Sequence, residues 1–299
     1  MSNVWRINLK TGAISGIDPR EFCLNRNILG VGWAIDYDRP DLNWEIYHKI
    51  ASNTHKDKGW SAALNAIINR MQVNDLCWTR NQQGLYYLGR ITSAWRYLNV
   101  EEYKSADVVN IRNCEWHKIG TVDAVPGRVV NSFIPPRTVQ KIDDNTINLF
   151  SKFIYNSFSI NFTYNLNKLE KVDIYSLLSS EDCEDILGIY LQNELSYFVV
   201  PSTCKSDTVA YEYTLINKSN GRSAVVQVKN GYDPLNADDY VSLDTDVFLF
   251  TTKGQYLGIS SENIKFVDPK TIEDFVFNNK AIMPKRIQTW ITLFQNLGL

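Results

Sequence analysis

Two short segments near residue 220 carry side chains that suit phosphate chemistry. The first contains Glu212, and the second contains Gln227 and, two residues later, Lys229. Because side chains two apart on a β-strand point to the same face, Gln227 and Lys229 are expected to emerge together. Carboxylate and carbonyl oxygens are the ligands that Mg²⁺ prefers, and a lysine ammonium can stabilise negative charge on a phosphate. These residue types at this spacing suit metal-assisted chemistry on a phosphate group, and they also occur in an ordinary strand that ends in a lysine.

The elements that must position these residues can be read from the surrounding pattern. An apolar stripe predicts a helix over 180–193, with Ser180 as its N-cap. Three strands are expected after it, and Asn220-Gly221 is a strong signal for a tight turn between the last two. These three strands span residues 195–203, 209–216 and 224–228. A further strand at 247–251 and helices near 272–277 and 287–297 complete the C-terminal half.

This order of elements, with Glu212 and the run Gln227-Val228-Lys229, resembles the PD-(D/E)xK nuclease superfamily between residues 181 and 230. The resemblance implies an α/β restriction-endonuclease-like fold, in which helices flank a mixed sheet. It implies Glu212, Gln227 and Glu184 as ligands of Mg²⁺ or Mn²⁺, and Lys229 as a catalytic residue. Gln227 replaces the commoner acid, and Glu212 stands without the usual Pro-Asp pair. Other carboxylates compete with Glu184 for the third position, namely Glu181, Asp182, Asp185 and Asp207.

The N-terminal half is rich in tryptophan and in short β-type runs. All but one of the eight tryptophans lie at or before Trp116. Strands are expected over 4–9, 30–35, 75–80, 85–92 and 108–113, because β-branched and aromatic residues gather there between Gly, Asn and Asp. Apolar residues recur at helical spacing over 60–71. Further helices are expected near 146–153 and 168–178. The pattern in the first half predicts a small barrel with one or two helices.

Several runs in this half make it similar to the PUA-like barrels that include EVE and YTH domains. The runs are Val4-Trp5-Arg6, Gly30-Val31-Gly32-Trp33, Asn74-Asp75-Leu76-Cys77-Trp78, Tyr87-Leu88-Gly89-Arg90-Ile91 and the later Trp116. The resemblance implies an α+β PUA-like β-barrel that binds a modified or flipped base against aromatic rings. Trp33 is the first candidate, because the adjoining glycines allow close approach of a ligand. Trp78 and Trp95 follow, although core packing is the ordinary role of any single tryptophan.

Length and charge bound the organisation of the chain. A chain of 299 residues with 44% apolar and 21% charged residues is long enough for two well-packed domains. We expect them over 1–145 and 146–299, because the prolines within 126–136 cannot continue a strand or a helix. The net charge is −2, with a slightly basic first half and an acidic second half. Excess carboxylate suits a cation site and argues against DNA binding by bulk charge in the second half.

The remaining composition excludes several classes. The five cysteines form no CxxC pair, so we expect neither a zinc site nor a disulfide framework. No apolar run is long enough to cross a membrane, and the first ten residues lack the features of a signal peptide. We therefore expect a cytoplasmic protein without a membrane partner.

The two resemblances together imply a modification-dependent restriction enzyme. The barrel would sense a modified base in double-stranded DNA, and the second domain would cut nearby with Mg²⁺ or Mn²⁺ in defence against phage or foreign DNA. Nucleases of this type often cut duplex DNA as dimers, so a homodimer is also an expectation. Two alternatives stay open: a catalytically inactive nucleic-acid-binding protein, and an RNA-directed reader or nuclease of the same folds.

Overall fold

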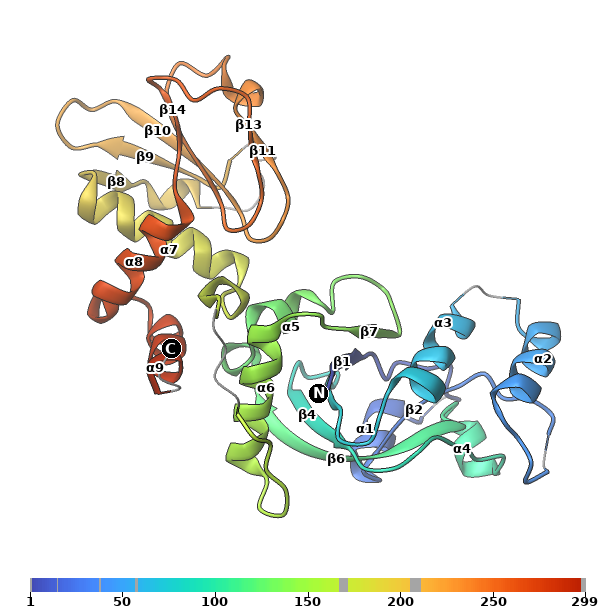
Figure 1. The fold of residues 1–299 in the computed structure, drawn as a ribbon. Coiled ribbons are helices and arrows are strands. Elements are labelled where there is room, and N and C mark those ends of the chain that lie inside the picture. Colours follow the sequence, from blue (N-terminus) through green and yellow to red (C-terminus); the bar gives the residue numbers. More distant parts are fainter. Residues whose placement is uncertain are drawn as a thin grey trace. The chain divides into compact units, whose positions relative to one another are not determined.

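The computed structural model describes residues 2–14, 16–37, 39–56, 59–166, 172–204 and 211–296. Contacts between Cα atoms divide the chain into two compact units, residues 1–170 and residues 171–299, which we call unit 1 and unit 2. Both units mix helices with β-sheet (Figure 1).

Unit 1 is built on a curled sheet that has seven strands among the described residues (Figure 1). Its strand order is β2-β6-β4-β3-β1-β7, and β5 pairs with β6. Only the pairing of β1 with β3 is parallel in this described sheet. The strands are β1 (Val4–Ile7), β2 (Ile28–Val31), β3 (Leu76–Arg80), β4 (Tyr86–Ile91), β5 (Arg96–Tyr97), β6 (Asn110–Gly120) and β7 (Val139–Lys141). A strand overlaps each expected range, but β2 ends at Val31 whereas a strand was expected over 30–35, and β5 and β7 are additional.

Helices fill the curl of this sheet with apolar side chains. Phe22, Tyr47 and Leu64 belong to the same buried core as Trp5 and Cys77 of the strands. The helices that supply them are α1 (Pro19–Asn25), α2 (Trp44–Thr54) and α3 (Trp60–Asn65), and a π-helical turn over Ala66–Arg70 continues α3. The helix expected over 60–71 is thus present, with its last turn widened.

Helix α6 (Asn145–Phe158) packs on strands β1 and β4 of unit 1. The indole Nε1 of Trp78 donates a hydrogen bond of 3.0 Å to Ser151 Oγ. The hydroxyl of Tyr155 donates to Glu115 Oε2 at 2.8 Å and accepts from Arg90 Nε at 3.0 Å. These contacts explain why the division by contacts falls after residue 170, and not after residue 145 where the expected boundary lies.

The proline-containing segment 126–136 does not end the unit. Arg6 of β1 is completely buried, and its guanidinium reaches the backbone carbonyls of Ser132 at 2.5 Å, of Pro135 at 3.2 Å and of Arg137. Helix α5 (Gly127–Asn131) lies within the segment, and β7 after it returns to pair with β1. A buried donor with several carbonyl acceptors can tie a loop to a sheet despite its prolines.

Unit 2 contains a mixed five-stranded sheet among its described residues, in the order β14-β12-β10-β9-β8. Strands β8, β9 and β10 are antiparallel neighbours, whereas β12 and β14 continue the sheet in parallel with β10. The strands are β8 (Tyr197–Val199), β9 (Tyr213–Asn217), β10 (Ser223–Lys229), β12 (Asp246–Thr251) and β14 (Ile264–Phe266). A separate parallel pair joins β11 (Leu235–Asn236) and β13 (Tyr256–Leu257). The sheet is mixed, as expected.

Helix α7 (Ser180–Glu194) runs along one face of this sheet and contacts α8 (Pro269–Asn278), while α9 (Lys285–Asn296) follows (Figure 1). The N-cap of α7 is Ser179, not the expected Ser180. The Ser179 hydroxyl accepts from the Asp182 amide at 3.1 Å, and the Asp182 carboxylate accepts from the Ser179 amide at 2.8 Å. This reciprocal pair satisfies two backbone donors at the start of the helix.

The helix expected over 168–178 is not an α-helix in its described part. Residues 172–178 contain a 3₁₀ turn over Ile174–Ser176, and residues 168–171 lie outside the described part of the chain. Asp173 caps this turn by accepting from the Tyr175 amide at 3.0 Å. A 3₁₀ turn is short and can be held by a local cap alone. The apolar spacing over 168–178 therefore predicted a longer helix than the described residues contain.

All five cysteines lie among the described residues and are free thiols. Cys23, Cys77, Cys114 and Cys183 are buried, and Cys204 is exposed. The five cysteines form no disulfide with one another in this structure. None of the helices in the described part of the chain combines the length and the apolar composition that a membrane crossing requires.

Candidate functional site

Strand β10 brings Gln227 and Lys229 beside the residue that precedes β9. Tyr213 of β9 lies opposite Val226, so Glu212 comes next to Gln227 in the antiparallel pair. The Gln227 Nε2 donates a hydrogen bond of 2.7 Å to Glu212 Oε1, and the Glu212 amide donates to the Val226 carbonyl at 2.8 Å. The structure therefore brings Glu212 and Gln227 together through the alternation and the hairpin expected from the sequence.

Gln227 is a buried polar residue in an otherwise apolar strand. It is 5% exposed, and Val225, Val226 and Val228 around it are equally buried. A buried amide costs free energy unless its hydrogen bonds are satisfied, and Glu212 supplies an acceptor. Lys229, at the end of the same strand, is only partly buried. The strand thus keeps the amide out of water and leaves the ammonium near the surface.

Glu184 on α7 interacts electrostatically with Glu212 and Lys229. Burial, followed by the negative charge of Glu212, raises the pKa of Glu184 to about 7, while Lys229 acts in the opposite direction. The backbone carbonyl of Glu184 also accepts a hydrogen bond of 2.9 Å from the Tyr213 hydroxyl, which fixes the helix against β9. Two neighbouring carboxylates repel each other when both are ionised, and a bound cation would offset this repulsion.

The alternatives to Glu184 differ in what they already do. Asp182 is engaged in the cap of α7, and Arg286 Nε lies 3.5 Å from its carboxylate. Glu181 and Asp185 are exposed. Asp207 lies outside the described residues. Among the residues that the structure does describe, no group of three or more His, Cys, Asp or Glu side chains could hold a metal ion. Beside Glu212 and Glu184, the amide oxygen of Gln227 is a further oxygen that could serve as a ligand.

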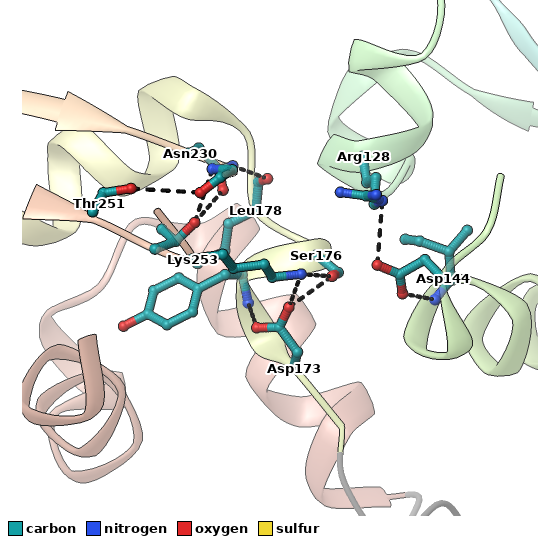
Figure 2. Close-up of polar contacts among 12 residues, drawn as sticks. Arg128, Asp144, Asp173, Ser176, Leu178, Asn230, Thr251 and Lys253 are labelled. Carbon is teal, nitrogen blue, oxygen red and sulfur yellow. Dashed lines mark hydrogen bonds and ion pairs between the residues drawn. The ribbon is translucent and has the colours of Figure 1, made fainter. Parts of the chain in front are cut away.

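A set of polar contacts joins the ends of β10 and β12 to the segment before α7 (Figure 2). Asn230 Nδ2 donates to the Leu178 carbonyl at 2.9 Å, and the Thr252 hydroxyl donates to Asn230 Oδ1 at 3.1 Å. The Thr252 amide donates to the Lys229 carbonyl at 3.0 Å. Asn230 therefore links the strand of Gln227 and Lys229 to the start of the helix that carries Glu184. The sequence analysis missed it, because an asparagine after a strand is an ordinary turn residue.

Lys253 makes a second connection to the same segment. Its Nζ donates to Ser176 Oγ at 2.9 Å and forms an ion pair with Asp173, and Ser176 Oγ donates to the Asp173 carboxylate at 2.8 Å (Figure 2). Figure 2 also shows the Arg128–Asp144 ion pair of unit 1, with 3.2 Å between Arg128 Nε and Asp144 Oδ2. The second Asp144 oxygen caps α6 by accepting from the Ile147 amide. Asp173 thus both pairs with Lys253 and caps the 3₁₀ turn in unit 2. Asp144 both pairs with Arg128 and caps α6 in unit 1.

The three tryptophans proposed from the sequence have different environments. Trp78 is 0% exposed and its indole N–H is bound by Ser151, so its ring has no face for a base in this structure. We therefore correct this assignment to a core role. Trp33 and Trp95 are partly buried and pack against the core from its rim. They remain candidates for stacking.

The glycines beside Trp33 serve the protein's own packing. A Cβ on Gly30 would lie 2.5 Å from Val108 Cγ1, and a Cβ on Gly32 would lie 2.0 Å from Asp107 Oδ1. The close approach that these glycines permit is thus made by residues 107 and 108, and not by the ligand expected there. The glycines in the sequence indicate that another group approaches the backbone closely, but they do not indicate whether that group is a ligand or another part of the protein.

The Arg90 side chain of β4 is engaged inside unit 1. Its NH2 group donates to Glu115 Oε2 at 2.8 Å, and its NH1 group donates to Asn74 Oδ1 at 3.0 Å. Its guanidinium also lies over the ring of Phe162, 4.2 Å from the centroid. These contacts hold the chain after α6 against β4.

Comparison with known proteins places only the first part of the chain beside a described family. Residues 5–141 match the family model described as a domain of unknown function, DUF8426. The match runs from β1 to β7 and therefore covers the curled sheet of unit 1 without α6. Neither the curated proteins nor the solved structures contain a significant match to this chain.

Proposed function

We propose that this chain is a metal-dependent DNA endonuclease, with its reaction centre in unit 2 and a PUA-like nucleic-acid reader in unit 1. The observation that carries the proposal is the 2.7 Å contact between Gln227 and Glu212, with Lys229 two residues further along β10. Strand β10 lies in the interior of a mixed sheet against which α7 packs, which agrees with the restriction-endonuclease-like arrangement implied by the resemblance.

The donor set fits a hard divalent cation. Glu212 and Glu184 offer carboxylate oxygens, Gln227 offers an amide oxygen, and Mg²⁺ and Mn²⁺ both favour such oxygen ligands. Burial and, after it, the negative charge of Glu212 raise the pKa of Glu184, and the repulsion between the two acids is a further argument for a positive charge between them. A bound Mg²⁺ would supply Lewis acidity and a more acidic water beside the scissile phosphate.

The chain's own residues have separate tasks in this scheme. Lys229 places an ammonium at the end of β10, where it can stabilise the charge that develops on the phosphate oxygens. Gln227 holds the Glu212 carboxylate in one orientation through its N–H donor. Glu184, with its raised pKa, holds a proton near neutrality until a cation or a rise in pH removes it.

The substrate proposal follows from the pairing of the units. Unit 1 would recognise a modified base in double-stranded DNA, and unit 2 would cut nearby, which is the arrangement of modification-dependent restriction of phage or foreign DNA. A cytoplasmic location and action as a homodimer belong to the same proposal. Unit 1 is the part that would supply most of the affinity, because its half of the sequence is the more basic.

One observation favours a second candidate, a catalytically inactive nucleic-acid-binding protein. The described residues contain no metal-binding group built from His, Cys, Asp and Glu alone, and the Gln227 amide already occupies one oxygen of Glu212. Calorimetric titration with Mn²⁺ separates the two functions. Binding that Glu212→Ala abolishes supports the nuclease, and no binding supports the inactive protein.

The decisive test is cleavage by the full chain. Unmodified, methylated, hydroxymethylated and glucosylated DNA, and RNA of the same sequence, are incubated with the protein in Mg²⁺, Mn²⁺ or EDTA. We expect cleavage of modified DNA with metal only, and a loss of about 10²–10³-fold in Lys229→Ala, because the ammonium acts mainly on the transition state. Lys265→Ala is the matched control, since Lys265 is an exposed lysine on β14 of the same sheet. Equal activity in both variants would overturn the assignment, and cleavage of RNA alone would redirect the substrate.

A further inference from the structure

Helix α6 of unit 1 carries a polar stripe beside its buried apolar face. Asn145, Asn148 and Lys152 follow one another at spacings of three and four residues, so they lie along one side of the helix. The Asn148 Nδ2 donates a hydrogen bond of 2.7 Å to the Ser2 carbonyl. This contact holds the first residues of the chain against the stripe.

A cavity lies where the stripe meets the start of the chain and β7. Asn145, Asn148 and Lys152 line it together with Asn3, which precedes β1, and Lys141 of β7. Its volume is about 220 Å³, whereas sites for drug-sized ligands have about 300–1,000 Å³. None of the described residues that line it is aromatic. The cavity therefore suits a small polar group and offers ammonium and amide donors to it.

Lys152 is the charged group of this cavity that has no counter-charge. It is partly buried, and burial lowers the pKa of its ammonium. Within the described part of the chain, no carboxylate pairs with it and no hydrogen bond engages it. Withdrawing an ammonium from water costs free energy unless an anion or an acceptor compensates it. A bound anion would supply this compensation.

The acids that line the cavity each have a cation of their own. Lys141 Nζ lies 3.4 Å from Asp143 Oδ1, and the Asp143 side chain is 91% exposed. Asp144 pairs with Arg128 and caps α6. Because these charges cancel in pairs, Lys152 leaves the cavity with a net positive charge. The start of α6 adds a partial positive charge of the same sign.

We propose that this cavity binds a phosphate group, with the Lys152 ammonium as its anchor and the Asn145 amide as a further donor. Lysine and asparagine side chains are common donors to phosphate oxygens, and charge-assisted hydrogen bonds of this kind are strong. A phosphate has more oxygens than a carboxylate, so it can accept from α6 and from Lys141 of β7 at once. Such a group belongs either to a free nucleotide or to the end of a nucleic-acid strand, and only the second source rests on the proposed function.

The test measures binding in EDTA, so it is independent of the metal centre of unit 2. The full chain in a phosphate-free buffer is titrated calorimetrically with inorganic phosphate, with acetate, and with a nucleoside and its monophosphate. Oligonucleotides with and without a terminal phosphate form a second pair. We expect the member of each pair that carries the phosphate to bind at least about 10-fold more tightly, the effect of one charge-assisted hydrogen bond.

Lys152→Met removes the ammonium and keeps a stem of similar length. It should weaken binding of the phosphate-bearing ligands about 10- to 100-fold. It should also raise the melting temperature without ligand, because a partly buried and unpaired charge is lost. Phosphate should then raise the melting temperature of the wild type but not that of Lys152→Met. Lys49→Met is the matched control, since Lys49 is an exposed lysine on α2 of the same unit.

Asn145→Asp tests the same site by adding a negative charge, and it keeps the test decisive if Lys152→Met does not fold. A carboxylate is favourable at the start of a helix, so α6 should form, while phosphate binding should weaken about 10-fold through repulsion. Asn43→Asp is its control. Asn43 caps α2 by accepting from the Ile46 amide, and aspartate caps a helix equally well. This change should leave phosphate binding as it is in the wild type.

Each outcome decides the inference. A wild-type protein that binds none of the phosphate-bearing ligands at millimolar concentration overturns the site, even if cleavage with Mg²⁺ supports the nuclease. Equal binding of acetate and phosphate, or equal effects of Lys152→Met and Lys49→Met, also overturns it. Binding of inorganic phosphate and the monophosphate supports a free ligand, and a preference confined to the phosphorylated oligonucleotide supports a strand end. Either result without nuclease activity supports the cavity and refutes the proposed function.

Discussion

Two candidate sites of this chain are assembled in different ways. The group in unit 2 comes from one helix and two neighbouring strands, so Glu212 and Gln227 meet through an antiparallel pair closed by a short turn. The rim in unit 1 comes from segments far apart in the sequence, and Asn110 and Tyr47 link Trp95 to Trp33 and the neighbouring Gly32. The first arrangement follows from local rules, whereas the second depends on tertiary packing.

This difference explains why similar residues in unit 1 have dissimilar roles. Trp78 lies within β3 and Trp95 directly precedes β5, but Trp78 is completely buried and Trp95 lies at the rim of the core. Strand alternation alone cannot say which face of a curled sheet is covered by a later helix. Here α6 covers Trp78 and contributes Ser151, which comes 73 positions later in the chain. A tryptophan's role is therefore decided by what packs on it.

Truncation is expected to have the largest effect, and it tests whether the core of unit 1 depends on packing by α6. A fragment of residues 1–145 lacks α6, which would expose the apolar surface over β1 and β4 and leave the Trp78 indole without Ser151. We expect this fragment to lose cooperative thermal unfolding, whereas a fragment of residues 1–170 should retain it. Circular dichroism melting of both fragments is the measurement. Equal, cooperative melting would support the expected boundary at residue 145 and show that α6 is dispensable to unit 1.

A smaller effect should separate the tryptophans. Trp78→Ala removes a fully buried ring and should lower the free energy of unfolding by about 3–5 kcal/mol. Trp33→Ala removes a partly exposed ring and should cost much less. Urea denaturation of the full chain, monitored by far-UV circular dichroism, compares the two. Similar losses would mean that Trp33 is a core residue and that the division of roles in unit 1 is wrong.

The pH dependence of stability tests the unit 2 group without any substrate. The pKa of Glu184 is raised from 4.5 to about 7, so the folded state holds its proton more tightly than the unfolded state between these values. The free energy of unfolding should therefore fall as the pH rises from about 4.5 to about 7. Glu184→Gln should remove that part of the decline in EDTA.

Urea titrations at several pH values measure the difference between wild type and Glu184→Gln. Glu181→Gln controls for loss of an exposed carboxylate from the same helix. A parallel decline in wild type and Glu184→Gln would show that the pKa of Glu184 is not raised in the folded state, and it would separate α7 from the proposed site.

The smallest effect concerns the hairpin that sets the unit 2 register. Gly221 has a φ angle of +70°, and a Cβ there would meet nothing within 4 Å. Gly221→Ala should cost about 1 kcal/mol from the backbone alone, and Gly221→Asn should cost less, because asparagine tolerates this region. Thermal melting detects both changes. A much larger loss would mean that the turn is held by tertiary contacts, which would weaken the contrast between the units.

Elements and contacts that depend on local sequence pattern could be predicted, whereas those that depend on tertiary packing could not. The strands that became β3, β4, β10 and β12 were found because their apolar residues lie between clear turn signals, and the Gln227–Glu212 contact follows from their pairing. Strand β7 was missed because the short run after the prolines has little apolar character, and its place depends on pairing with β1 and on Arg6. Asn110 and Asn230 gave no signal either. Each is an ordinary polar residue until the partners of its amide are known.

The distribution of thiols gives the molecule an internal reporter of unfolding. Burial raises the pKa of Cys23, Cys77, Cys114 and Cys183, so these thiols are protected from alkylation in the folded state. Three of them are in unit 1 and Cys183 is in unit 2, while Cys204 is exposed. A thiol-reactive probe should therefore label Cys204 at once and the others only as each unit opens. The order in which the mass increments appear would time the opening of the two units in one unmodified chain.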